Sequence, residues 1–283
     1  MSLSDKISLS NELAIFKLKH RSNADRALAL SAVFWFTIAF IGQLIFVLYI
    51  IGLYGVSLIE GDFERWNAMM PKGYTEGDLA GNINIGIHLM LAAVISFGGP
   101  LQIIPSLRKW FPTFHRWNGR IYIGTAIIIS LTGFYLTWIR GSVGGLIGDI
   151  AITINGVLII AFAVIAIRYA MRRTFGAHRK WALRLFMVVS GVWFFRVGFM
   201  FWMLIHQKPV GFDPVTFQGP FLTFLNFAQY LIPLLILEIY FWAKEKSGGT
   251  GKMVVATLIT IFALITAIGI FGATMGMWLP NLT

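Results

Sequence analysis

An arginine in the middle of an apolar segment is the residue of this sequence whose position most needs a chemical explanation. Arg196 lies within MVVSGVWFFRVGFMFWML, residues 187–204, which is long and apolar enough to cross a bilayer. A charged side chain at that depth costs at least about 2.5–3.5 kcal/mol, and such residues usually face a bundle interior and carry a function. Its guanidinium offers several fixed N–H donors, which suit a carbonyl, a carboxylate or a phosphate group.

Polar side chains on four other apolar segments are expected at nearly the height of Arg196. At about 1.5 Å of rise per residue, Arg196 lies roughly 20 Å from the inner end of its segment. The residues that fall near the same level are Gln43, His88, Asn155 and Asn226. Hydrocarbon cannot satisfy their hydrogen bonds, so we expect them to line one interior site. His88 would contact a ligand there, and the three amides would orient it.

The acidic residues leave two interpretations of this site open. Asp149 is the nearest candidate counter-ion for Arg196, because Glu238 is expected roughly 10 Å or more too deep to pair with it. Arg196, Asp149 and the amides could form a satisfied network that locks the helices together. Alternatively, a donor-rich site binds an anionic or carbonyl-bearing ligand, for which a quinone, a haem propionate and a lipid phosphate are all suitable.

Two basic turns form a second candidate site. The first reads RKWFPTFHRWNGR (108–120) and the second RRTFGAHRKWALR (172–184), and each holds a His-Arg pair followed by another arginine. The likeness suggests a duplicated helical hairpin, although short basic turns also converge. His115 and His178 are expected at similar heights, where two imidazoles could bind the iron of haem b from opposite sides.

The arginines of these turns are candidates for holding the propionates of such a haem. They are Arg116, Arg120, Arg179 and Arg184. The alternative is that they bind anionic lipid head groups at the cytoplasmic membrane surface.

The chain resembles a family of bacterial membrane proteins catalogued as domain of unknown function 2306. The resemblance rests on His88, Gln102, Arg196 and the motifs HRWNGRIY (115–122) and HRKWALR (178–184). It covers roughly residues 83–200. It implies a multi-helix membrane fold and no established reaction.

Composition predicts one helical membrane domain. Of the 283 residues, 57% are hydrophobic and 12% are charged, whereas a soluble domain carries about 25% charged residues. Seven segments are long enough to span a bilayer: about 27–56, 83–105, 121–139, 148–167, 182–206, 221–243 and 253–279. We therefore predict an all-α, polytopic integral membrane protein whose spans two to five form the core. Residues 1–26 would be a cytoplasmic tail or surface helix, and residues 27–283 the transmembrane domain.

The distribution of charge predicts the orientation. With a cytoplasmic N-terminus, the outer side carries only Arg65, Lys72, Arg140 and Lys208 of the 23 Lys and Arg residues, and Arg196 lies within a span. This bias follows the positive-inside rule, so we expect an N-in, C-out protein of the bacterial inner membrane. The net charge of +11 would then face anionic lipid and not nucleic acid.

Irregular features of the spans lead to three further expectations. Gly98, Gly99 and Pro100 interrupt the second span, where we expect a kink. The acidic loop between the first two spans, about residues 57–82, should be solvated. Gly272 and Gly276 have the spacing that lets helices pack closely, so the seventh span could join a larger membrane protein complex.

The remaining sequence signals narrow the function. The chain has no cysteine, which excludes disulfides and thiolate metal sites, and it has no phosphate-binding loop or HExxH motif. We therefore predict a redox or electron-transport role through haem b or a quinone held by the His and Arg clusters. The alternative is a non-enzymatic accessory subunit with lipid bound at its basic cytoplasmic face.

Overall fold

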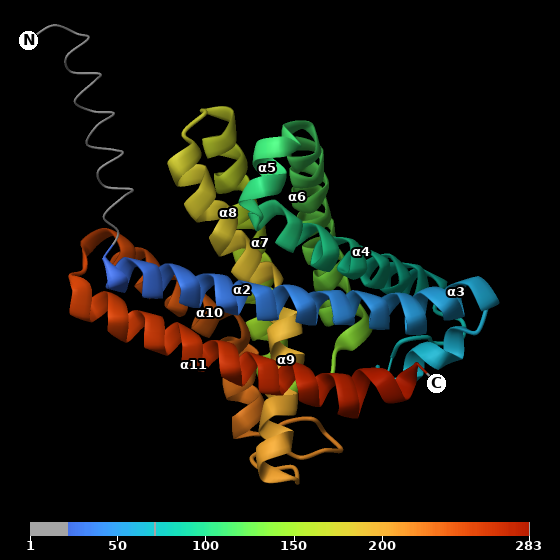
Figure 1. Cartoon of the computed structure of the whole chain (residues 1–283). Helices are drawn as coiled ribbons and strands as arrows, with labels where there is room; N and C mark the ends of the chain where they lie inside the picture. The colour runs from blue at the N-terminus through green and yellow to red at the C-terminus, as the bar shows by residue number, and fades with distance from the viewer. Residues whose placement is uncertain (1–21, 71, 283) are drawn as a thin grey trace, which may run out of the picture.

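The computed structural model describes residues 22–70 and 72–282 and consists of long helices (Figure 1). The α-helices are α2 (Asn23–Ile50), α3 (Val56–Glu60), α4 (Leu79–Ile103), α5 (Pro105–Trp110), α6 (Pro112–Tyr135), α7 (Gly145–Met171), α8 (Phe175–Val189), α9 (Gly191–His206), α10 (Pro220–Lys246) and α11 (Gly249–Ala273). The predicted surface helix falls mostly within residues 1–21, outside the described residues.

The predicted helical membrane fold is confirmed. Among the described residues, six helical segments are long and apolar enough to cross a membrane, and the pair α8 and α9 makes a seventh span if it is counted as one. The first span is longer than expected because α2 continues through a π-helix, η1 (Ile51–Gly55), into α3. Short π-helices also extend α6 (η3, Leu136–Gly141) and α11 (η4, Thr274–Trp278).

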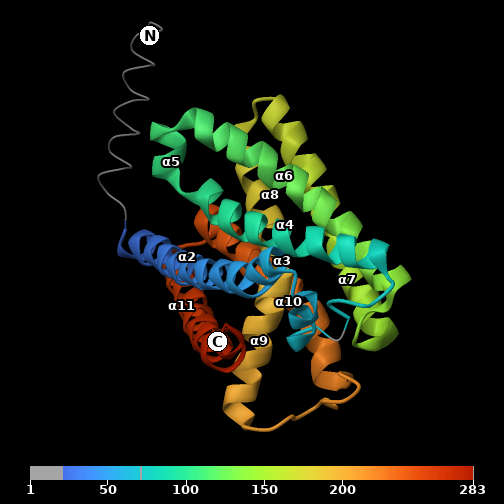
Figure 2. The ribbon, with the colours of Figure 1, turned by 90° about the vertical axis from the view of Figure 1, so that its right-hand side faces the viewer.

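The first and last spans lie side by side, and α9 crosses them steeply (Figures 1 and 2). An ion pair of 2.7 Å between Asp25 and Lys252 joins the beginnings of α2 and α11. At the crossing, a Cβ atom on Gly269 would lie 2.4 Å from the carbonyl oxygen of Val197. The glycines of α11 therefore let α9 approach within the same chain, which is a packing role that needs no second protein.

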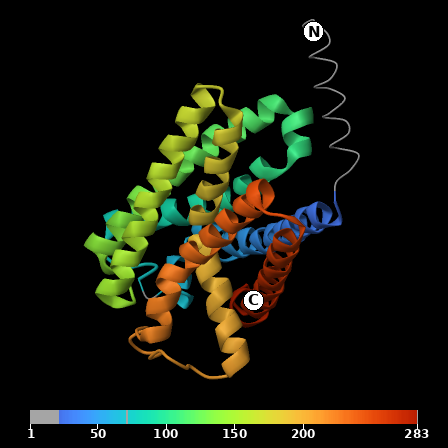
Figure 3. The ribbon, with the colours of Figure 1, turned by 90° about the vertical axis from the view of Figure 1, so that its left-hand side faces the viewer.

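Two apolar clusters hold the helices together. The larger joins α2, α4, α9, α10 and α11, and the smaller joins α4, α6, α7, α8 and α10. Figure 3 shows the α7–α8 hairpin beside α10. Spans two to five thus surround the smaller cluster, and the first and last spans complete the larger one.

The helix of the second span is continuous through the predicted interruption at Gly98–Pro100. Helix α4 continues past Pro100 to Ile103, and Asn118 of α6 donates a hydrogen bond of 2.9 Å to the carbonyl of Gly98. Neighbouring side chains of this kind let a proline stay within a transmembrane helix. The fifth span is broken instead, with a bend of 51° between α8 and α9 at Ser190.

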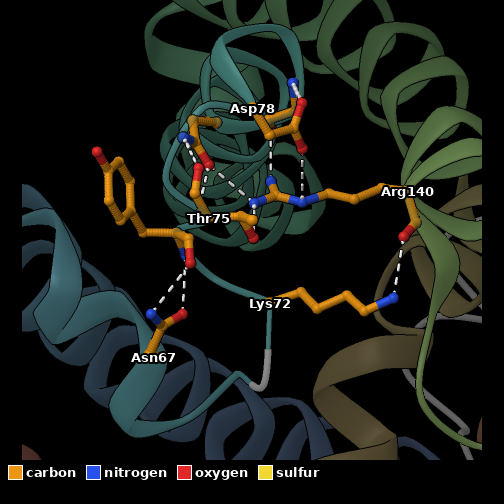
Figure 4. A network of polar contacts seen from close by, with 8 residues as sticks. Asn67, Lys72, Thr75, Asp78 and Arg140 are labelled. Atoms are coloured by element: carbon orange, nitrogen blue, oxygen red, sulfur yellow. Dashed lines mark hydrogen bonds and ion pairs between the residues drawn. The ribbon is translucent and has the colours of Figure 1, made fainter.

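The acidic loop between the first two spans exposes Glu60, Asp62, Glu64 and Glu76, as predicted, but it is anchored by a buried tryptophan. Trp66, in the short 3₁₀-helix η2 (Phe63–Ala68), is only 2% exposed. Arg140, at the end of η3, donates to the carbonyl of Gly81 (2.6 Å) and to Asn82 Oδ1 (2.8 Å), and its Nε lies 3.5 Å from an Asp78 carboxylate oxygen (Figure 4). Lys72 in turn donates to the carbonyl of Arg140 (3.1 Å). This network ties the loop to the end of the third span.

Candidate functional site

Arg196 lies on α9 a turn and a half beyond the break, and its guanidinium reaches α2. The guanidinium carbon is 5.4 Å from the centre of the Phe46 ring, which is a cation–π distance. Its one hydrogen bond within the described part of the chain runs from Nη1 to the carbonyl of Val192 (3.2 Å). Nε and Nη2 therefore remain as donors without an acceptor among residues 22–70 and 72–282.

A pair of tyrosines lies next to Phe46, the ring that this guanidinium contacts, and the ring centres of Phe46 and Tyr49 are 6.1 Å apart. The hydroxyl groups of Tyr49 and Tyr54 are 3.3 Å apart, both side chains are 2% exposed, and both lie within electrostatic range of Arg196. Residues five apart do not share a face of an α-helix, whereas the i→i+5 pattern of a π-helix brings them together. The π-turn η1 thus creates the tyrosine pair, and π-turns are frequent at functional sites.

His88 faces the same region from α4. Its Nδ1 is 2.9 Å from the hydroxyl of Thr132, whose own proton is donated to the carbonyl of Ile129 (3.1 Å). Thr132 can therefore only accept, so His88 carries its proton on Nδ1 and leaves Nε2 as a free acceptor. The imidazole lies within electrostatic range of Arg196. We call Phe46, Tyr49, Tyr54, His88 and Arg196 the Arg196 site.

Aromatic side chains cover the Arg196 site on the side of the packed loop. Trp66 lies edge-on to Tyr54, with ring centres 6.4 Å apart, and a Cβ atom on Gly86 of α4 would lie 3.1 Å from it. Trp278 of η4 stacks on Tyr49 at 6.1 Å. The Arg140 network (Figure 4) fixes the loop that carries Trp66, so it holds this cover in place.

The acidic residues of the spans bind elsewhere. Asp149, the predicted counter-ion, accepts a hydrogen bond from Ser142 in the loop before α7. The predicted Arg196–Asp149 pair is therefore wrong: Asp149, near the beginning of α7, is directed towards that loop. Glu238 pairs with Arg184 through contacts of 2.6 and 2.8 Å, which agrees with the prediction that it does not reach Arg196.

Two of the predicted amides meet at the helix break instead of at Arg196. Gln43 of α2 donates to the hydroxyl of Ser190 (2.9 Å), and the amide nitrogen of Asn155 lies 2.9 Å from where Gly191 would carry a Cβ atom. The side-chain oxygens of Gln43 and Asn155 are buried and accept no hydrogen bond from the described residues. Gln229 of α10, whose amide oxygen lies 3.7 Å from the same Cβ position, joins them.

Asn226 lies apart from both groups. Its amide nitrogen is 3.4 Å from the Cβ position of Gly148 on α7, and its carbonyl accepts a hydrogen bond from Gln229 (2.8 Å). The sequence argument missed Gln229, Tyr49 and Tyr54. Gln229 was detectable as a second amide one helical turn after Asn226. The tyrosine pair was not, because it depends on the π-turn.

The two histidines of the basic turns lie within electrostatic range of each other. His178 donates from Nδ1 to the carbonyl of Ala166 (3.0 Å), an arrangement that leaves Nε2 free and is typical of metal-binding histidines. His115 has a buried Nδ1 without a partner among the described residues. Groups of three or more His, Cys, Asp or Glu suited to a metal ion are absent from the described ranges, but a pair of imidazoles is enough for haem iron.

The arginines of the two turns have similar neighbours, which supports the internal duplication. Arg120 lies over the Trp117 ring at 4.9 Å, and Arg184 lies over the Trp181 ring at 4.6 Å, each three residues after its tryptophan. Arg184 is also held by Glu238. The two turns differ in that α5 lies within the first and has no counterpart in the second. Arg116, which contacts Thr113 (3.3 Å), and Arg179 are exposed.

Comparison with known proteins identifies the family. A family model described as "Predicted membrane protein (DUF2306)" matches residues 85–232, more than half of the chain. The match includes His88, both basic turns and Arg196, and excludes Gln43 and the tyrosine pair. Neither a curated protein nor a solved structure matches the chain. The protein belongs to the DUF2306 family of predicted membrane proteins.

Proposed function

We propose that this protein has a redox role in the bacterial inner membrane, and that the Arg196 site binds the head group of a quinone. The orientation that we propose is N-in and C-out, as the distribution of Lys and Arg predicts. The observation that carries the proposal is the Arg196 guanidinium, which has no acidic partner among the described residues.

The hydrogen-bonding capacity of the site favours a carbonyl-bearing ligand. Nε and Nη2 of Arg196 can both donate, and the tyrosine pair has one hydroxyl proton that is not needed between the two oxygens. An isolated charge in a span is costly, and a ligand oxygen would offset part of that cost. Quinone carbonyls supply two such acceptors.

The surroundings favour a quinone over a charged lipid head group. The walls of the site are the aromatic rings of Phe46, Tyr49, Tyr54, Trp66 and Trp278, which suit a flat ring. Arg196 lies well inside its span, and a phosphate would have to leave water to reach it. A quinone head group is uncharged and enters the bilayer core more easily. His88, with a free Nε2, could accept a proton when the quinone is in its reduced state.

A binding measurement tests the proposal. The full chain would be purified in mild detergent, and its solvent extract assayed for quinone before and after incubation with decylubiquinone. We expect close to one quinone per chain for the wild type and at least a tenfold loss for Arg196→Gln. Arg179→Gln, which changes an exposed arginine, is the matched control and should bind as the wild type does.

Two results would contradict the proposal. The first is a wild-type protein that binds no quinone even after incubation. The second is unchanged binding by Arg196→Gln. A quinone-free protein that instead co-purifies with a larger assembly would favour the alternative, an accessory subunit with anionic lipid at its basic face.

Haem b at His115 and His178 is a second candidate, favoured by the hydrogen bond from His178 Nδ1 to Ala166. The two imidazoles fit the group in type, and of the four predicted propionate partners, Arg179 and Arg116 are the least engaged. When bound, haem would supply one-electron transfer. An absorption spectrum of the reduced protein tests this: a Soret band that both His115→Ala and His178→Ala abolish supports haem, and a featureless spectrum after haem supplementation contradicts it.

A further inference from the structure

A cavity of about 610 Å³ lies between α9, α10 and α11, on the opposite face of α9 from Arg196. Val197, Gly198 and Phe201 line it, whereas Arg196 points to Phe46 of α2. A stack of Trp202 on Phe221, with ring centres 4.4 Å apart, bounds it near the α9–α10 loop. Largely apolar cavities of this volume between helices are the usual form of small-molecule sites.

The volume of the cavity limits the size of its occupant. At about 30 Å³ for each water-sized group, it holds roughly 20 non-hydrogen atoms. That suits one ring with part of one hydrocarbon chain, and it is too little for a phospholipid with two chains. The lining runs along α10 from Pro220 to Pro233, about 20 Å by helical rise, so the occupant extends well into the bilayer.

Two polar side chains among the lining residues offer an acceptor that receives no hydrogen bond from the described residues. Gln229 is 5% exposed and donates one N–H of its amide to the carbonyl of Asn226 (2.8 Å), and its Oε1 has no donor within the described part of the chain. Thr266 is 2% exposed and donates its hydroxyl proton to the carbonyl of Phe262 (2.7 Å). Gln229 lies as far before the end of α10 as Thr266 lies after the start of α11, so both stand at one height.

We propose that this cavity binds an isoprenoid hydroquinone, with a ring hydroxyl donating to Gln229 or Thr266. A buried acceptor without a donor is costly, and a hydroxyl group supplies the missing proton. Oxidised quinones and phospholipid esters have no such proton. Phe194 and Phe262, which also line the cavity, offer rings against which an aromatic head group can pack.

The Arg196 site and this cavity are therefore complementary. The first has donors in excess and suits a quinone carbonyl, and the second has acceptors in excess and suits a quinol hydroxyl. The identity of the head group rests on the proposed function, but the experiments below can contradict ligand binding at one site without contradicting it at the other.

The test uses the full chain in phosphatidylcholine nanodiscs without quinone. Decylhydroquinone, kept reduced under anaerobic conditions, and oxidised decylquinone are titrated separately, with tryptophan fluorescence as the readout. Gln229→Leu and Thr266→Val each remove an acceptor. Ile265→Trp fills the cavity from its lipid-facing side, and Leu264→Trp, next to it but outside the lining, is the matched control. Thermal unfolding verifies that each variant is folded.

We expect Gln229→Leu to weaken hydroquinone binding about tenfold and Ile265→Trp to abolish it, with Leu264→Trp unchanged. Arg196→Gln should lose decylquinone and retain decylhydroquinone, which would separate the two sites. The proposal is overturned if Ile265→Trp binds hydroquinone as the wild type does. It is also overturned if Gln229→Leu and Thr266→Val both bind normally, because the cavity would then recognise only a hydrocarbon chain.

Discussion

Arg140 and Arg196 both belong to apolar spans, Arg140 at the end of its span and Arg196 well inside, and their surroundings differ in almost every respect. Arg140, 5% exposed, contacts a carboxylate, a main-chain carbonyl, an amide oxygen and the hydroxyl of Thr75. Arg196 has one carbonyl of its own helix and an aromatic ring. The first environment is that of a network that locks helices, in which both Nη atoms donate hydrogen bonds and Nε faces the carboxylate of Asp78. The second leaves donors free, as a binding site does.

The difference between the two arginines separates the two explanations that the sequence left open for Arg196, a network that locks helices and a ligand-binding site. A network that locks helices should satisfy its arginine, and the protein satisfies Arg140 in this way where the loop must be fixed. Arg196 has no such network, although two acidic residues, Asp149 and Glu238, lie in the predicted spans. The structural explanation therefore fits Arg140, and the ligand-binding explanation fits Arg196.

The largest effect on stability should come from removing the Arg140 network. Arg140→Met removes the hydrogen bonds to the carbonyl of Gly81 and to Asn82 Oδ1 together with the ion pair to Asp78. We expect it to lower the free energy of unfolding by about 3 kcal/mol. Equilibrium unfolding in mixed micelles measures this change. The loop around Trp66 should also become sensitive to protease. A loss below about 1 kcal/mol would show that the network does not fix the loop.

Arg196→Met should act in the opposite direction. In protein freed of quinone, replacing an unpaired charge within a span by an apolar side chain of similar length should raise the free energy of unfolding by about 1–2 kcal/mol. The same unfolding measurement applies, with Arg140→Met as the contrasting variant. A loss of stability as large as that of Arg140→Met would mean that Arg196 is a lock after all.

The positions of these residues along the chain were predictable, but their partners were not. Hydropathy and helical rise place Arg196 and His88 within their spans, because depth depends only on counting residues. The pairing of Asp149 with Ser142 depends on which way the beginning of α7 faces, and depth does not give that direction. The tyrosine pair depends on a π-turn, which shifts the register of side chains without a sequence signal. The packed loop depends on Arg140, which lies about 60 residues after it in the chain.

Smaller effects are expected at single hydroxyl groups. Tyr54→Phe removes one half of the 3.3 Å contact with Tyr49 and should lower stability by about 1 kcal/mol. It should also weaken quinone binding severalfold, because the pair loses its free proton. Tyr122→Phe is the matched control: this hydroxyl is buried and has no partner among the described residues, so its removal should leave stability unchanged or raise it. Equal losses in both variants would assign the effect of Tyr54→Phe to packing alone.

The smallest effect should come from a third arginine, Arg184, whose contact with Glu238 is close but partly exposed. The side chains are 19% and 47% exposed, and ion pairs in such positions contribute about 0.5 kcal/mol. Glu238→Gln should therefore change the free energy of unfolding by no more than that, and high salt should reduce the difference between variant and wild type. Glu245→Gln, which breaks the more exposed pair with Lys180, should have even less effect. A loss of several kcal/mol for Glu238→Gln would instead place Arg184 with Arg140 among the locks, and would weaken its candidacy as a partner for a haem propionate.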